Sequence, residues 1–96
     1  MKFVIRNQAG IPNKYIRFVK WKLMQILRKF NTGLYTEVYI TDEGKNPTMY
    51  QATVIIGVSG PDIVLKERSH NLNELWSNMS LKVKRQLRKM SEKASY

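Results

Sequence analysis

The side chains in this sequence that are best suited to chemistry are its lysines and arginines. They outnumber the acidic residues 17 to 7 and give a net charge of +10. Residues 1–36 hold eight basic residues and no acid, and residues 82–96 hold six basic residues and one acid. Like charges repel and destabilise a folded chain, so two such segments predict a polyanionic partner. The chemistry they indicate is neutralisation of phosphate groups.

Groups suited to catalysis or metal binding are sparse. The absence of cysteine excludes disulfides, thiolate ligands and thiol nucleophiles. His70 is the only histidine, and its place between a predicted strand and a predicted helix indicates a capping or surface role. The sequence has no glycine-rich phosphate loop. We therefore expect a protein that is not an enzyme, with no catalytic residues, no metal, no cofactor and no small-molecule substrate.

The pattern of apolar residues predicts six elements that must position the basic side chains. Alternation of apolar and polar residues predicts strands at Lys2–Asn7, Leu34–Thr41, Thr48–Ile56 and Ile63–Ser69. The last three strands are joined by short connections, so neighbours among them should be antiparallel. Helical spacing predicts one helix over Lys14–Phe30, capped by Asn13, and another from a cap at Asn71 or Asn73 to about Lys93.

This order predicts an α+β fold, a β-α-β-β-β-α two-layer sandwich. A four-stranded sheet with both helices packed on one face lets each element bury its apolar side. Residues 1–96 are too few for two domains, so we expect a single domain, as a monomer or weak dimer. The start of the chain lacks the pattern of a signal peptide, and no segment approaches the roughly 20 apolar residues of a membrane span. We expect a cytoplasmic protein without stable membrane association.

The predicted outward face of the first helix mixes cations with aromatic rings. With Ile16, Val19, Leu23 and Phe30 turned inward, a turn of about 100° per residue points the others outward. The outward set is Lys14, Arg17, Phe18, Trp21, Gln25, Arg28 and Lys29. Cations neutralise phosphates, and the rings of Trp21 and Phe18 could stack on unpaired bases. Alternatively, these two rings pack beneath a loop or against a dimer partner.

The second helix carries a denser basic face. Its predicted outward cations are Lys82, Lys84, Arg85, Arg88 and Lys89. A solvated face with cations near the helix C-terminus is the alternative interpretation, because the helix dipole favours positive charge there. That benefit falls off beyond the last turn, and acids that would balance the cations at a spacing of four residues are missing. We therefore expect this run to contact a polyanion.

The last helix also carries the most specific family resemblance. The run Lys82-Val83-Lys84-Arg85-Gln86-Leu87-Arg88-Lys89 resembles the Lys-apolar-x-Arg-Gln-Leu-x-Lys pattern in the last helix of the ribosome hibernation-promoting factor and ribosome-associated inhibitor A family. The predicted order of elements is similar to that family over nearly the whole chain. Asn73 stands where the family usually has tyrosine, and Ser77 where an acid is common. The resemblance is therefore to a divergent member, of the short form.

This resemblance implies a partner and a mechanism. Such proteins bind the small ribosomal subunit in the mRNA channel, over the tRNA sites, and block translation under stress. Lys82, Arg85 and Lys89 match the family's basic pattern, so the resemblance implies that they contact rRNA. The same role for Lys84, Arg88 and the first-helix cations rests on helix geometry alone.

Two other functions fit the same residues. One is a general double-stranded RNA-binding module that recognises duplexes by shape, without ribosomes. The other is a protein-interaction or peripheral-membrane module with no RNA role, in which Trp21, Phe18 and their basic neighbours meet an anionic lipid interface.

Overall fold

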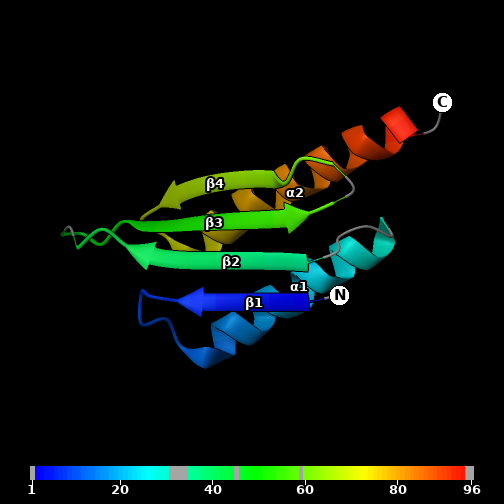
Figure 1. Ribbon diagram of the computed structural model, residues 1–96. Helices are drawn as coiled ribbons and strands as arrows, with labels where there is room; N and C mark the ends of the chain where they lie inside the picture. Colours follow the sequence, from blue (N-terminus) through cyan, green and yellow to red (C-terminus); the bar gives the residue numbers. More distant parts are fainter. Residues whose placement is uncertain (1, 31–34, 45, 59, 95–96) are drawn as a thin grey trace.

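The elements follow the predicted order in the computed structural model, which describes residues 2–30, 35–44, 46–58 and 60–94, with side chains as far as Met90. They are β1 (Lys2–Asn7), α1 (Asn13–Lys29), β2 (Tyr35–Asp42), β3 (Tyr50–Gly57), β4 (Ile63–Ser69) and α2 (Leu72–Ala94). The strands form one sheet, and both helices lie behind it in Figure 1. This arrangement confirms the predicted α+β sandwich.

The sheet is mixed, with the strands in the order β1-β2-β3-β4. β1 runs parallel to β2, and α1 forms the crossover between them, whereas the β2–β3 and β3–β4 pairs are antiparallel. The register places Ile5 opposite Val38, Val38 opposite Val54, and Val54 opposite Leu65. Successive side chains of a strand alternate between faces, so this row and its neighbours two residues away face the helices.

The core lies between this face of the sheet and the inner faces of the helices. α1 contributes Val19, Leu23, Ile26 and Leu27, and α2 contributes Leu75, Met79, Val83 and Leu87. The strands add Val38, Ile40, Ala52, Val54, Ile56 and Ile63. Full burial of one large aliphatic side chain contributes about 1.5–3 kcal/mol, so these contacts hold each helix on the sheet and determine which residues point outward.

The two helices begin differently. α1 starts after Pro12, whose carbonyl oxygen accepts hydrogen bonds from the amides of Tyr15 (3.0 Å) and Ile16 (3.3 Å). The predicted cap at Asn13 is wrong, because Asn13 is already helical and no side chain in the described part of the chain caps this end. In α2, Asn71 is the cap, since its Oδ1 accepts a hydrogen bond from the Glu74 amide at 3.1 Å.

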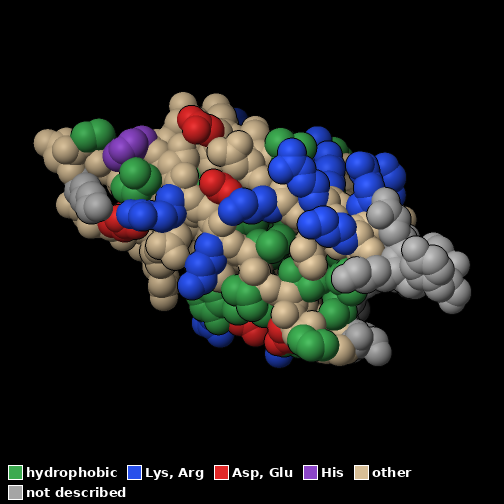
Figure 2. Space-filling model, turned by 90° about the horizontal axis from the view of Figure 1, so that it is seen from above, with side chains coloured by type: hydrophobic (Ala, Val, Ile, Leu, Met, Phe, Trp, Pro, Cys, Tyr) green, Lys and Arg blue, Asp and Glu red, His purple; other side chains and the backbone are tan. Residues whose placement is uncertain are grey.

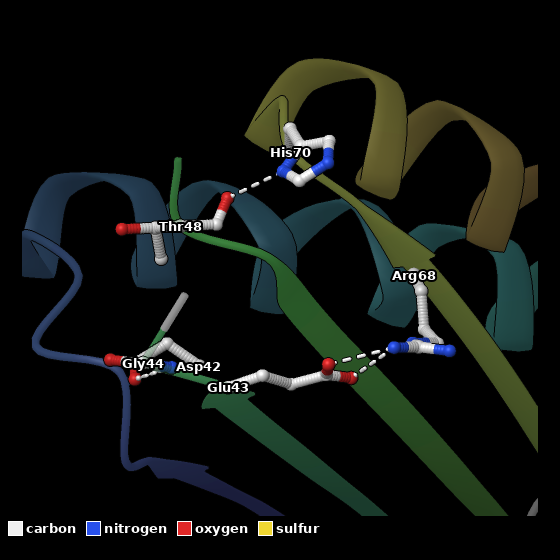
Figure 3. Close-up of polar contacts among 6 residues, drawn as sticks. All are labelled: Asp42, Glu43, Gly44, Thr48, Arg68 and His70. Atoms are coloured by element: carbon white, nitrogen blue, oxygen red, sulfur yellow. Dashed lines mark hydrogen bonds and ion pairs between the residues drawn. The ribbon is translucent and has the colours of Figure 1, made fainter. Parts of the chain in front are cut away.

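Polar contacts join the β2–β3 connection to β4 and to the start of α2 (Figure 3). The Arg68 guanidinium lies 2.7 Å from both carboxylate oxygens of Glu43. His70 Nδ1 lies 2.9 Å from the carbonyl oxygen of Thr48, to which it donates a hydrogen bond. His70 is exposed, as predicted, and it helps to hold the connection that precedes β3.

Candidate nucleic-acid interface

The outward face of α1 is exposed as the helical period predicts. Lys14, Arg17, Arg28 and Lys29 are all exposed, and none makes an ion pair with another described residue. Trp21 and Phe18 are 54% and 44% exposed. Neither ring is packed beneath a loop of the described chain; stacking on a base and contact with a dimer partner both stay predictions for these rings.

The outward face of α2 carries four further exposed cations, Lys84, Arg85, Arg88 and Lys89. Within the described part of the chain, no carboxylate pairs with any of them. Figure 2 shows lysine and arginine side chains gathered over the part of the molecule where α2 leads to the C-terminus. Side chains three or four positions apart share a helix face, so Lys84 and Arg88 form one stripe, and Arg85 and Lys89 another.

Lys82 has a different environment from the other predicted RNA-contact residues. Its ammonium group lies 2.9 Å from a carboxylate oxygen of Glu67 and donates a hydrogen bond to the carbonyl oxygen of Lys66 at 2.7 Å. Both partners belong to the edge strand β4. Lys82 therefore fastens α2 to the sheet. The sequence feature that could have indicated this contact is Glu67, which shares the helix-covered face of β4 with Ile63 and Leu65.

A groove separates the outward faces of the two helices. Its volume is about 530 Å³. The lining residues are Phe18, Lys22, Gln25, Ile26 and Lys29 from α1, and Trp76, Ser77, Ser80, Leu81 and Lys84 from α2. None of the described residues that line it is acidic. Sequence reasoning placed Phe18, Gln25, Lys29 and Lys84 on the outward faces but missed the groove, because helical periodicity does not say which flanks of two helices face each other.

The opposite face of the sheet, which no helix covers, carries charges of both signs. Lys2 and Arg6 of β1 lie opposite Tyr35 and Tyr39 of β2. The Tyr39 hydroxyl donates a hydrogen bond to Glu37 at 2.6 Å, and this bond is the main cause that raises the pKa of Tyr39. This mixture of acids, cations and tyrosines contrasts with the outward faces of the helices, where cations predominate.

Other kinds of site find little support in the described residues. No group of three or more histidine, aspartate or glutamate side chains there could hold a metal ion. No helix among them combines the length and the apolar character needed to cross a bilayer. What the arrangement can do chemically is contact phosphates through the ammonium and guanidinium groups on two neighbouring helices.

Comparison with known proteins shows which solved structures share this fold. No protein-family model and no curated protein matches the sequence. Among solved structures, a ribosomal subunit interface protein from Coxiella burnetii is similar, with a TM-score of 0.81 and 14% identity over 96% of this chain and 99% of that one. The N-terminal domain of Thermus thermophilus Protein Y is similar with a TM-score of 0.73 and 17% identity, over 94% of this chain and 99% of that one. At such identities, the likeness establishes a shared fold.

Proposed function

We propose that this protein is a ribosome-associated translation inhibitor that binds the small ribosomal subunit through the outward faces of α1 and α2. The observation that carries the proposal is that eight cations predicted on the outward faces of these helices are all exposed and lack a carboxylate partner in the described chain. They are Lys14, Arg17, Arg28, Lys29, Lys84, Arg85, Arg88 and Lys89. The fold supports a ribosomal partner, since a protein that shares it is named for the interface between ribosomal subunits.

The proposed mechanism is occupancy rather than catalysis. Contacts to phosphates fix the position and orientation of a protein on RNA without reading its sequence. A small domain with a packed core keeps its shape when it binds, so it can fill a cavity of matching shape in the ribosome. Translation would stop because the protein occupies the space for mRNA and tRNA. The proposed function takes place in the cytoplasm and needs no cofactor or substrate.

Sedimentation with purified ribosomal subunits tests this proposal. The wild-type protein is expected to sediment with small subunits at about 50 mM salt and to dissociate substantially at about 200 mM, because binding through phosphates is strongly salt-dependent. The double variant Lys84→Glu/Arg88→Glu should remain at the top of the gradient. The matched control is Lys2→Glu/Lys66→Glu, which reverses two exposed cations on the open sheet face. Each double variant lowers the net charge from +10 to +6.

The proposal predicts that the control still sediments with small subunits. Loss of binding in both variants to the same extent would show that net charge alone matters, and would contradict a role for the helices. Equal affinity for free duplex RNA and for subunits would favour the general double-stranded RNA-binding module. Binding to anionic vesicles without binding to either RNA would contradict the proposal.

A further inference from the structure

The groove between α1 and α2 combines apolar and aromatic surface with a size suited to a small ligand. Its volume of about 530 Å³ falls within the roughly 300–1,000 Å³ of small-molecule sites. Phe18 and Ile26 line it from α1, and Trp76 and Leu81 line it from α2. Phe18 and Leu81 are 44% and 49% exposed, so the groove presents apolar surface to an external partner.

The polar groups of the groove are complementary to an anion that also carries hydrogen-bonding edges. Lys22, Lys29 and Lys84 line it, and no acidic side chain of the described chain does. The Lys22 ammonium lies 5.2 Å from the ring centre of Trp21 and 5.8 Å from that of Phe18. Attraction of the cation to these ring faces keeps it beside the aromatic surface. The amide of Gln25 and the hydroxyls of Ser77 and Ser80 add donors and acceptors.

We propose that this groove binds an unpaired RNA base. A nucleotide joins a flat aromatic base, with polar edges, to an anionic phosphate, which matches the composition of the groove. The base would stack on Phe18 or Trp76, with its phosphate near Lys29 and Lys84. This inference rests on the proposed RNA-binding function and deepens it, because bases within a duplex are stacked and cannot enter. The preferred ligand is therefore RNA with a bulged or looped-out nucleotide.

Two hairpin RNAs with the same stem, one of which carries a single bulged purine, test the proposal. The variant Trp21→Phe leaves Trp76 as the only tryptophan, so its fluorescence reports on the groove. The bulged hairpin is expected to bind about tenfold more tightly, within the range that stacking of a base on an aromatic side chain provides. It should quench Trp76 fluorescence, and the perfect hairpin should not.

Matched alanine variants separate the groove from the rest of the surface. Leu81→Ala and Phe18→Ala should reduce the preference for the bulge to about twofold or less, with affinity for the perfect hairpin little changed. Alanine favours helix, so neither substitution is expected to disturb the fold. Val64→Ala is the control, because Val64 is 54% exposed but lies on the open face of the sheet. The preference should be unchanged in that variant.

The possible failures are distinguishable. Equal affinity for the two hairpins, with no change in Trp76 fluorescence, would overturn the inference and leave the proposed RNA binding intact. Failure of both hairpins to bind at about 50 mM salt, together with failure to bind small subunits, would overturn the proposed function as well. An acidic amphipathic peptide that alters Trp76 fluorescence where the bulged RNA does not would assign the groove to a protein partner.

Discussion

Replacing Lys84 and Arg88 with glutamine is expected to weaken RNA binding without weakening the fold. Both side chains are exposed on α2, and neither pairs with a carboxylate among the described residues. Substitutions at exposed positions that lack such partners usually change stability by no more than about 0.5 kcal/mol. The substitutions should therefore reduce the affinity for RNA almost entirely by removing electrostatic contacts to phosphates.

The magnitude follows from the release of counterions. Each phosphate that a cation neutralises adds about 0.9 to the slope of log affinity against log salt for a duplex. Over a fourfold rise in salt, from about 50 to about 200 mM, one contact accounts for roughly a 3.5-fold loss of affinity. If both cations contact phosphates, the slope of log affinity against log salt should be smaller by about 1.8 in the double variant. The same rise in salt should then weaken binding by the wild type roughly 12-fold more than binding by the double variant.

Lys82→Gln provides the comparison within the same helix. Lys82 is bound to Glu67 and to the Lys66 carbonyl. Lys82→Gln should therefore change the salt dependence of RNA binding less than Lys84→Gln or Arg88→Gln does. It should also lower the free energy of unfolding by up to about 1 kcal/mol. Fluorescence anisotropy with a labelled hairpin at several salt concentrations gives the slopes, and urea unfolding gives the stability. An unchanged slope in the double variant, or a larger change in Lys82→Gln, would refute the reasoning.

Three further predictions concern the fold. Burial raises the pKa of Tyr15 to about 12, and its hydroxyl donates a hydrogen bond to the Leu72 carbonyl at 2.6 Å. The part of the stability that depends on neutral Tyr15 should therefore persist below about pH 10 and decline between about pH 10 and 12. Urea unfolding of Tyr15→Phe should show a weaker decline over this pH range. Thr36→Val should raise the free energy of unfolding by about 1 kcal/mol, because the buried Thr36 Oγ1 has no hydrogen-bond partner among the described residues; lower stability would contradict this. Gly57→Ala should lower the melting temperature, because a Cβ there would overlap the Tyr35 ring; an unchanged value would show that the ring moves freely.

The elements of the fold were predictable because each has one apolar side. Val19, Leu23, Ile26 and Leu27 recur at helical spacing and are the residues that α1 buries. In the strands, alternation identified the face that contains Val54, which is fully buried. The predicted strands at residues 2–7 and 63–69 match β1 and β4 at both ends. Amphipathic patterns of this kind are local, so they can be read without knowledge of the packing.

Features that depend on contacts between distant residues could not be predicted in the same way. The start of α1 is a local exception: the helix begins one residue earlier than predicted, and the Pro12 carbonyl accepts hydrogen bonds from the amides of Tyr15 and Ile16. The ion pair of Lys82 with Glu67 required the position of α2 over β4. The groove required the distance between the helices, which no local pattern contains.

The candidate site was predictable as a surface but not as a set of contacts. Each cation predicted to point outward is exposed, since exposure follows from the helical period. That these cations contact RNA stays a prediction, as do the single domain over residues 1–96 and the monomeric or weakly dimeric state. The ion pair with Glu67 separates Lys82 from the other four cations of that run, although all five were predicted to contact RNA.

Directed hydroxyl-radical probing of small-subunit rRNA is the most direct test of whether the helix faces contact the ribosome. The chain contains no cysteine, so one introduced thiol can carry an iron chelate at a chosen position. Asn73→Cys places it at an exposed position on α2, and Val64→Cys places it on the open sheet face. We predict strong rRNA cleavage from Asn73→Cys and little from Val64→Cys. Strong cleavage from Val64→Cys alone, or from neither variant, would contradict the account.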